Sequence, residues 1–511
     1  MTEPVRANRI DHPVRHARGV VLPPNKTAST QHPLEAAPLP RELIITLEGG
    51  LSARDLRPAA ETGQRVLRGQ PLVQGGSSLS TWTHASTSGV VRSIETRAIA
   101  HPRRRHALCA MIEPDGLDEP APDLHPPDVA QWDTPDKLAL ALSRAGLSGL
   151  GGAVFPTGLK LSATARHKTR LVIINGMECE PYISCDDMLM RTSPKDVIAG
   201  ALALVALTGA EQGVIGIEED KPQAHKALHD ALPKLDTQQK LSIVTLPVRY
   251  PAGGERQLIE ALTGEEVPSL AKPTDLGLLV QNVGTATALY RYLATGHPMT
   301  SRVTTVTGAV KTPRNFEVRL GTPIADLVAA CGGYTGSVAR LIMGGSMMGI
   351  ALASDEMPVG RATNCIVAAT REELRQNDEA LPCIRCGNCS DVCPARLMPQ
   401  ELFLAATHGE LGTLEGMGLF DCIECGCCDV VCPSHISLTE SFRVDKRNVV
   451  QALDLPARAR RLDTREQLRR ERVARWEREH GEAGVEPLPF KSRLEAVADL
   501  IARAREATKT S

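Results

Sequence analysis

Two regular sets of cysteines constrain this chain more than any other feature of its sequence. Both follow the pattern C-x2-C-x2-C-x3-C-P within residues 383–432. The first set is Cys383, Cys386, Cys389 and Cys393, and the second is Cys422, Cys425, Cys428 and Cys432. Three thiolates spaced by two residues can wrap one face of an iron–sulfur cubane. In two-cluster proteins the fourth cysteine, before the proline, ligates the other cluster.

The spacing therefore predicts two [4Fe–4S] clusters with crossed ligands. One cluster takes Cys383, Cys386, Cys389 and Cys432, and the other takes Cys422, Cys425, Cys428 and Cys393. Structural zinc is the alternative, but zinc sites use four ligands in all and pair C-x2-C knuckles. Between the sets, residues 399–408 have a helical pattern, which favours an all-helical two-cluster ferredoxin domain. Electron transfer between adjacent clusters is the expected activity.

Other cysteines carry less information. Cys427 falls outside the register and is expected to be a spare thiol beside a cluster. Cys109, Cys331 and Cys365 are isolated, and each is expected to be a small buried side chain. A secreted disulfide framework would need an export signal, and the first residues lack the apolar core of a signal peptide.

Charge and hydropathy exclude several classes of function. The 511 residues carry a net charge of −2, so no overall field favours nucleic acid or anionic lipid. The longest apolar run, residues 197–210, is shorter than the roughly 20 residues that span a bilayer. We expect a buried helix there and a protein that stays in the cytoplasm.

The chain before the cysteine sets divides into three patterned regions. Residues 41–112 alternate apolar and polar positions, as an antiparallel β unit does, and look like a barrel-sandwich hammerhead. Its expected hairpin tip, residues 83–86, lacks a carrier lysine, so a swinging-arm role is not expected. Residues 113–133 are a Pro- and Asp-rich linker. A helix is then expected to start with Thr134 as N-cap and Pro135 at its first position.

From residue 146 to about 290, apolar strands alternate with helices, which indicates a mostly parallel α/β sheet. Strands are expected at 171–175, 213–217 and 241–248. Such sheets bind ligands at the carboxyl ends of their strands, where polar residues gather at 175–180, 218–220 and 253–255. The glycine-rich loop 149–158 with Lys160 suits a phosphate, although such a loop is more often only a turn.

Two further regions complete the chain. Residues 303–350 read as strand, strand, helix and strand, in the manner of a small β-grasp unit, with Met347 and Met348 as core residues. Beyond residue 455 the chain is dense in Arg and Glu at helical spacing, which usually means a solvated helix. The expected divisions are 1–112 (β domain), 113–135 (linker), 136–300 (α/β domain), 301–375 (β-grasp), 376–445 (ferredoxin) and 446–511 (charged helical tail).

Seven segments in family order resemble the C subunit of the Rnf electron-transport complex, a close relative of the SoxR-reducing complex. They include GLGGAVFPTGLKL, LVIINGMECEPYISCDDMLM, YPAGGERQLIEALTGEEVP, LVQNVGTA and both cysteine motifs. The resemblance runs from about residue 18 to 445. It implies a multidomain α/β protein with a barrel-sandwich-like N-terminal unit, a Rossmann-like FMN/NADH domain, an SLBB-like β-grasp unit and the ferredoxin domain.

The resemblance also implies a function and a location. The chain would be a peripheral subunit on the cytoplasmic side of the inner membrane, without a transmembrane helix. It would oxidise NADH at non-covalent FMN and pass electrons through the clusters to membrane-embedded, flavin-bearing subunits. The complex couples NADH and ferredoxin redox to ion translocation, and in nitrogen-fixing bacteria it is thought to supply low-potential ferredoxin for nitrogenase.

The site residues carried over by motif are expectations of the same resemblance. FMN would be held by Gly149, Gly151, Gly152, Lys160, Asn175, Glu178, Gly254, Glu255, Asn282 and Thr285. NADH would be met by Phe155 and Glu180. No acid–base residue is nominated. The family usually has glycine where this chain has Val154, so a flavin-free iron–sulfur relay is the alternative, as is a SoxR-reducing role.

Overall fold

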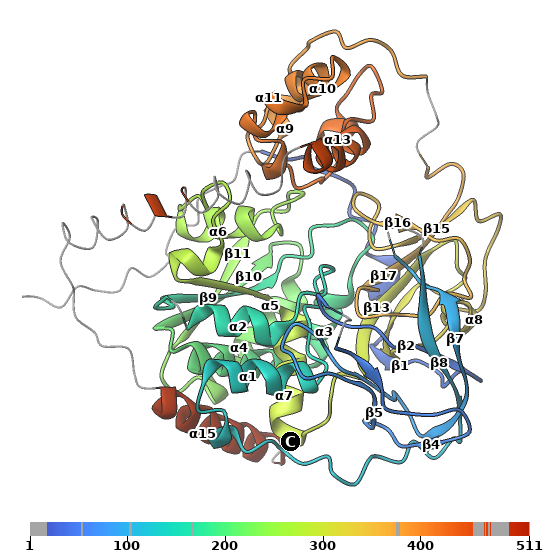
Figure 1. The fold of residues 1–511 in the computed structure, drawn as a ribbon, viewed down its shortest axis with the longest axis vertical. Helices are drawn as coiled ribbons and strands as arrows, with labels where there is room; N and C mark the ends of the chain where they lie inside the picture. Colours follow the sequence, from blue (N-terminus) through green and yellow to red (C-terminus); the bar gives the residue numbers. More distant parts are fainter. Residues whose placement is uncertain are drawn as a thin grey trace, which may run out of the picture.

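The computed structural model describes residues 18–52, 55–101, 105–165, 167–374, 379–452, 464, 467, 468, 471 and 490–509. Figure 1 shows an α/β unit at the centre, two β units beside it and a small helical unit above it. Within those ranges, no helix combines the length and the apolarity that crossing a bilayer requires.

The central unit is a fully parallel sheet in the order β11-β10-β9-β12. Its strands are β9 (Leu171–Gly176), β10 (Gln212–Glu218), β11 (Leu241–Leu246) and β12 (Leu278–Asn282). The first three match the predicted strands, whereas β12 was not expected. Both faces are covered, so β9 and β10 are almost continuously buried.

Helices cover the sheet, and the first of them starts at the capping signal predicted from the sequence. They are α1 (Pro135–Arg144), α2 (Thr157–Thr164), α3 (Cys185–Thr192), α4 (Pro194–Thr208), α5 (Pro222–Leu235), α6 (Glu255–Thr263) and α7 (Val283–Thr295). Thr134 caps α1 as predicted, accepting from the Lys137 N–H at 3.3 Å, with Pro135 at the first position. The long apolar run forms α4, which is buried and not membrane-spanning.

Gly200 sets how closely α4 approaches α7. A Cβ at this position would lie 2.0 Å from the carbonyl oxygen of Ala286, an approach that only glycine permits. We expect Gly200→Ala to push the two helices apart and to destabilise the protein by about 1–3 kcal/mol. The measurement is the thermal unfolding transition, expected to fall by about 5 °C.

A matched control separates crowding from helix propensity. Gly412 lies in α11 (Leu411–Gly416), and a Cβ there would meet no heavy atom within 4 Å. Gly412→Ala is therefore expected to be neutral or to stabilise by up to about 1 kcal/mol. Equal melting temperatures for Gly200→Ala and Gly412→Ala would contradict the proposed crowding.

The N-terminal β unit is antiparallel, as predicted. Its strands are β2 (Leu43–Thr46), β3 (Arg57–Pro58), β4 (Arg65–Val66), β5 (Pro71–Gln74), β6 (Thr83–His84), β7 (Gly89–Ala98) and β8 (His106–Pro114). Residues 83–86, the expected hairpin tip without a carrier lysine, are all buried. Arg361, far along the chain, donates to the Thr83 hydroxyl at 3.5 Å, so this segment is covered and does not extend as an arm.

The β-grasp unit has the predicted strand, strand, helix and strand, with further short strands added. It contains β13 (Ser301–Gly308), β14 (Arg314–Arg319), α8 (Ile324–Ala330), β15 (Arg340–Met343), β16 (Ile350–Ala351) and β17 (Cys365–Ala369), and β1 (Glu35–Ala36) joins β14. Met348 is not a core residue, since it is 47% exposed. Met347 is only partly buried, because both lie in the turn between β15 and β16.

The helical unit contains both cysteine sets. Its helices are α9 (Asn388–Val392), α10 (Pro399–Thr407), α11, α12 (Cys427–Val430) and α13 (Leu438–Ala452). α10 matches the helix expected between the motifs. Most of the charged stretch beyond residue 455 lies outside the described residues, but α15 (Phe490–Lys509) buries Leu494, Val497 and Ile501 in the core that includes α4.

Candidate functional site

The two cysteine motifs adopt the same backbone conformation. Arg385 and Glu424 occupy equivalent positions with φ of 56° and 57°, and Gly387 and Gly426 follow with φ of 84° and 78°. The N–H groups of Arg385 and Glu424 each lie 3.4 Å from the sulfur of the first cysteine of their motif. These left-handed residues turn the chain tightly, as a loop that wraps a cluster requires.

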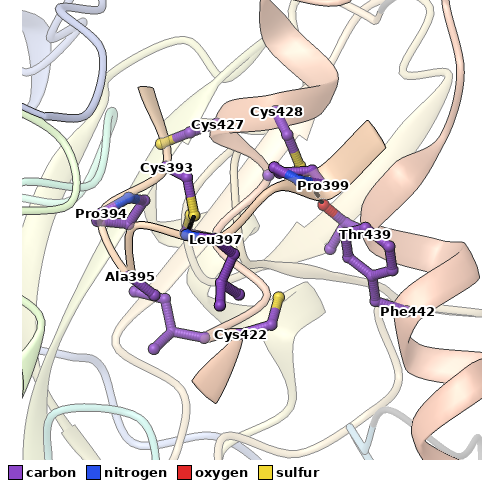
Figure 2. Close-up of a pocket in the computed structure, with 13 residues that line it drawn as sticks. Cys393, Pro394, Ala395, Leu397, Pro399, Cys422, Cys427, Cys428, Thr439 and Phe442 are labelled. Carbon is purple, nitrogen blue, oxygen red and sulfur yellow. Dashed lines mark hydrogen bonds between the residues drawn. The ribbon is translucent and has the colours of Figure 1, made fainter. Parts of the chain in front are cut away.

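One pocket is lined by five cysteines from the two motif segments. Four of them belong to the motif pattern: Cys422, Cys425 and Cys428 of the second motif and Cys393, the last cysteine of the first. Cys427, which falls outside that pattern, also lines the pocket. Figure 2 shows the thiols of Cys393, Cys422 and Cys428 directed into this space, whereas that of Cys427 points away. This grouping is the one that crossed ligation predicts for one of the two clusters.

The other set lies nearer to the surface. Cys383 and Cys386 are exposed and Cys389 is buried, with its sulfur 3.2 Å from the Gln400 amide oxygen. The segment before Cys383 is tied to the segment after Cys432. Leu381 N–H donates to the Ser434 carbonyl at 2.9 Å, and the Ser434 hydroxyl donates to the Pro382 carbonyl at 3.0 Å. These bonds bring the start of the first motif beside the end of the second.

The donor sets fit iron–sulfur clusters. Each motif offers thiols on a tight loop with backbone N–H groups aimed at sulfur, the arrangement that tunes and orients cluster ligands. The isolated Cys109, Cys331 and Cys365 are buried elsewhere, as expected. Cys427 is fully buried, with its sulfur 3.9 Å from the Tyr250 carbonyl oxygen.

The second cysteine loop packs directly on the α/β unit. The Tyr250 hydroxyl donates to the Cys425 carbonyl at 2.8 Å, and the Tyr250 backbone pairs with Val20. Tyr250, Val20, Cys425 and Cys427 form one buried apolar cluster, against which Met347 also packs. Tyr250 was not singled out from the sequence, although it opens the YPAGGER segment.

The predicted flavin residues gather at the carboxyl edge of the sheet. Asn175 and Asn282 are direct register partners at the ends of β9 and β12. The Asn175 amide donates to the Gly253 carbonyl at 2.8 Å, which draws the 250–254 loop over this edge. Gly151 lies against Asn282, because a Cβ on it would stand 3.4 Å from the Asn282 Cβ.

Lys160 brings a cation to the same edge. Its ammonium group donates to Glu255 Oε1 at 2.6 Å and to the Val280 carbonyl at 2.7 Å. The Thr285 hydroxyl accepts from the Leu150 N–H at 2.9 Å, so the glycine-rich loop is fixed beside the start of α7. A lysine, a glycine-rich loop with open space around Gly152 and a helix N-terminus together fit the phosphate of a flavin nucleotide.

Val154 holds a backbone conformation that branched residues rarely adopt. Its φ is 51°, in the left-handed region. We expect Val154→Gly to relieve about 1–2 kcal/mol of strain, offset by about 0.5–1 kcal/mol of chain entropy. The variant should melt at or slightly above the parent temperature, whereas Val244→Gly in β11 should cost at least about 1 kcal/mol. A clear destabilisation by Val154→Gly would contradict the strain.

The two glutamates of the NGMECEP segment use their carboxylates to accept hydrogen bonds from backbone N–H groups. Glu178 accepts from the N–H groups of Asp186 and Asp187 at 2.7 and 3.2 Å and so caps α3. Glu180 accepts from Met347 and Met348 N–H in the β15–β16 turn. Asp186, which accepts from the Asn282 amide at 2.6 Å, was not singled out from the sequence. The sequence signal that could have identified Asp186 is the pair Asp186-Asp187, which lies in the same quoted segment as Glu178 and Glu180.

Burial changes the protonation of this region. Desolvation raises the pKa of Asp186 to about 7, with the nearby Glu178 adding to it, and also raises that of Glu178. At the end of β10, Glu218 pairs with the fully buried Lys221, and desolvation raises the Glu218 pKa to about 7. Glu178, Cys185 and Asp186 present ligand atoms within 4.8 Å of one another, but the carboxylates already accept hydrogen bonds from the protein.

Glu180 makes folding stability depend on pH. Desolvation raises its pKa to about 7 from an ordinary 4.5, so the folded state favours the protonated form. Its contribution to stability is full below about pH 4.5 and is lost as the pH rises through 7. Relative to the parent, Glu180→Gln should therefore gain up to about 3 kcal/mol between pH 5 and pH 8. Unfolding measured at both pH values checks this, and the exposed Glu356→Gln should show no such gain.

Family models match four parts of the chain. They are described as an RnfC barrel sandwich hybrid domain over residues 14–117, a Nuo51 FMN-binding domain over 142–291, an SLBB domain over 303–351 and a 4Fe-4S dicluster domain over 378–436. The expected fold class is thereby confirmed: a barrel-sandwich unit, an FMN-binding α/β domain, a β-grasp unit and a dicluster domain.

Curated relatives cover most of the chain. Proteins named as the C subunit of an ion-translocating oxidoreductase complex are 42% identical over 90% of this chain in Pseudomonas aeruginosa, 41% over 91% in Yersinia enterocolitica and 39% over 96% in Pectobacterium atrosepticum. The chain spans 59%, 67% and 70% of their respective lengths.

A solved NAD+-reducing [NiFe]-hydrogenase in the air-oxidized state aligns with a TM-score of 0.42 at 19% identity, covering 63% of this chain and 62% of that one. This last likeness is too low to bear on function.

Proposed function

This chain belongs to the family formed by the C subunits of ion-translocating oxidoreductase complexes, and we propose that it oxidises NADH at bound FMN and relays the electrons through two [4Fe–4S] clusters. The observation that carries the proposal is the direct packing of the second cysteine loop on the flavin-type domain through Tyr250. A two-electron donor and one-electron carriers need a converter between them, and a flavin supplies that chemistry when bound.

The proposed cluster ligands are crossed. Cys422, Cys425, Cys428 and Cys393 hold the inner cluster, and the pocket that they share supports this. Cys383, Cys386, Cys389 and Cys432 hold the outer cluster, whose exposed Cys383 and Cys386 suit delivery to a partner. Electrons would enter at the inner cluster, beside the flavin domain, and leave from the outer one.

The proposed flavin residues bind and orient; none transfers a proton. Lys160 and the start of α7 neutralise the phosphate, and Gly149, Gly151 and Gly152 let the backbone approach it. Asn175, Asn282, Thr285, Gly254 and Glu255 shape the rest of the pocket. Phe155, which is 39% exposed, is free to stack on NADH. Glu178 acts through its cap on α3, and a direct role for Glu180 toward NADH would require its carboxylate to leave the β15–β16 turn.

The proposal puts the chain in a larger assembly. It would attach peripherally to the cytoplasmic face of the inner membrane beside membrane-embedded, flavin-bearing subunits, and exchange electrons with ferredoxin only through them. Ion translocation, and a supply of electrons for nitrogen fixation, would belong to that assembly. The proposed domain limits are those stated above, with the ferredoxin unit extended through α13 to Ala452.

NADH titration of anaerobically purified protein tests the proposal. We expect the flavin absorbance band to bleach first, followed by the EPR signal of a reduced cluster. Protein that contains both cofactors but shows no bleaching with NADH would overturn NADH oxidation.

A flavin-free electron relay is the second candidate, and the strained Val154 within the glycine-rich loop favours it. This candidate predicts that the purified protein has about eight irons per chain and no flavin absorbance band. It also predicts that the protein binds no flavin when FMN is added. A SoxR-reducing role leaves both cofactors in place and differs only in the final acceptor.

A further inference from the structure

Glu180 stands where three units of the fold meet. It follows β9 in the α/β unit, and its Oε1 accepts from Met348 N–H at 2.7 Å and Met347 N–H at 3.1 Å in the β15–β16 turn. Gly345 gives the carboxylate its room, because a Cβ there would lie 1.9 Å from Glu180 Cγ. The β-grasp turn and the α/β unit are thus joined through this one carboxyl group.

The same turn touches the loop of the inner cluster. A Cβ on Gly426, which lies between Cys425 and Cys427, would stand 3.5 Å from Met347 Cε. Met347 packs on the cluster of buried residues that contains Cys425 and Tyr250. A single layer of side chains therefore separates the Glu180 carboxylate from the inner set of cysteines, and the medium between them is apolar.

One oxygen of Glu180 is left without a partner. Oε2 is buried and makes no hydrogen bond within the described part of the chain. Burial raises the pKa of this group to about 7, against the opposing effect of the two N–H donors and of Lys26. An orphaned carboxylate oxygen is costly when charged and becomes an O–H donor when protonated. Solvent is near, because the neighbouring Met348 is 47% exposed.

Three neutral groups around Glu180 keep one charge state near pH 7. Desolvation raises the pKa of the Cys179 thiol to about 12 and raises the pKa values of Tyr250 and Cys365, so these three stay neutral. Lys26 is a cation that donates to the Glu178 carbonyl. Glu218, at the end of the adjacent strand, is paired with Lys221, and it is the second acid that an experiment must separate from Glu180.

We propose that Glu180 takes up a proton when the inner cluster is reduced, so that the potential of that cluster depends on pH. This inference rests on the proposed function, because it requires a cluster at Cys422, Cys425, Cys428 and Cys393. One electron, given by the reduced flavin or by dithionite in vitro, reaches the cluster, and one proton from water binds Glu180 Oε2. No other bond forms or breaks. Glu180 is a positioning residue, since it touches neither the cluster nor its ligands.

The expected size follows from electrostatics. Two unit charges that are separated by one layer of buried side chains still interact appreciably, because the effective dielectric constant there is about 20 and not that of water. At fixed potential, the ratio of reduced to oxidised inner cluster should therefore fall about tenfold as the pH rises from 6 to 9. A tenfold change corresponds to 59 mV for a one-electron couple.

EPR-monitored redox titration of the full chain at pH 6, 7.5 and 9 tests the proposal. A dissolved paramagnetic lanthanide chelate identifies the outer cluster, because it speeds the relaxation of the exposed one. The inner midpoint should become more negative with pH in the parent, should be constant in Glu180→Gln, and should keep its slope in Glu180→Asp and Glu218→Gln. The outer midpoint should not respond to any of these variants.

Three results would overturn the proposal. The first is a midpoint potential of the inner cluster that is constant with pH in the parent. The second is a pH dependence of that midpoint that survives in Glu180→Gln. The third is loss of the inner cluster from both Glu180 variants, which would give Glu180 a purely structural role. Parent protein without iron–sulfur signals would instead refute the proposed function, so the two failures can be told apart.

Discussion

Cys393→Ala is expected to remove the buried inner cluster and to leave the exposed outer cluster intact, although Cys393 belongs to the first motif. The reason is that Cys393 lines the same pocket as Cys422, Cys425 and Cys428 of the second motif. Iron should fall from about eight to about four atoms per chain. The remaining EPR signal should be the one that the dissolved lanthanide chelate relaxes.

The reciprocal variant, Cys432→Ala, tests the same crossed ligation on the other cluster. Cys432→Ala should remove the outer cluster and leave the signal that the chelate does not reach, because the Ser434 bonds hold this segment beside Cys383. If each cluster were instead held by the four cysteines of one motif, Cys393→Ala would remove the outer cluster and Cys432→Ala would remove the inner one. Cys427→Ala is the matched control, since Cys427 lies outside the motif pattern and its thiol is directed away from those of Cys393, Cys422 and Cys428 (Figure 2), and it should retain about eight irons. Zinc in place of iron in the parent would contradict the whole assignment.

Gly151→Glu is expected to abolish flavin binding without unfolding the protein. Gly151 is exposed and lies against Asn282, at the edge where Lys160 and the start of α7 would neutralise a phosphate. A carboxylate there brings a like charge within about 5 Å of the phosphate, which costs about 3 kcal/mol at an effective dielectric constant of about 20. The affinity for FMN should fall about a hundredfold, measured by the flavin absorbance retained after gel filtration.

The control for this variant is a glycine in another unit. Gly76 lies in the N-terminal β unit, where a Cβ would meet nothing within 4 Å, and Gly76→Glu should leave flavin content unchanged. Cluster signals and the melting temperature should persist in both variants, because residue 151 is in an exposed loop. A flavin band of normal intensity in Gly151→Glu would place the flavin elsewhere and would return attention to the flavin-free relay.

Local patterns predicted most of the fold. Cysteine spacing, capping by Thr134 and Pro135, and the alternation of apolar strands with helices each depend on neighbours close in sequence, so they can be read directly from the sequence. The strand β12 (Leu278–Asn282) was missed, because five apolar or amide residues before a helix carry no distinctive period. The burial of residues 83–86 was not predicted, because burial depends on what packs over a segment.

The sequence by itself determined the two cysteine motifs, the parallel α/β unit and the family to which they point, because these reside in short-range spacing and in periodicity. Only the tertiary structure decided that Cys393 joins the second motif in one pocket, that Tyr250 links this pocket to the α/β unit, and that Glu180 faces the β15–β16 turn. Such contacts join residues far apart in the chain, and their partners are set by how separately folded units pack.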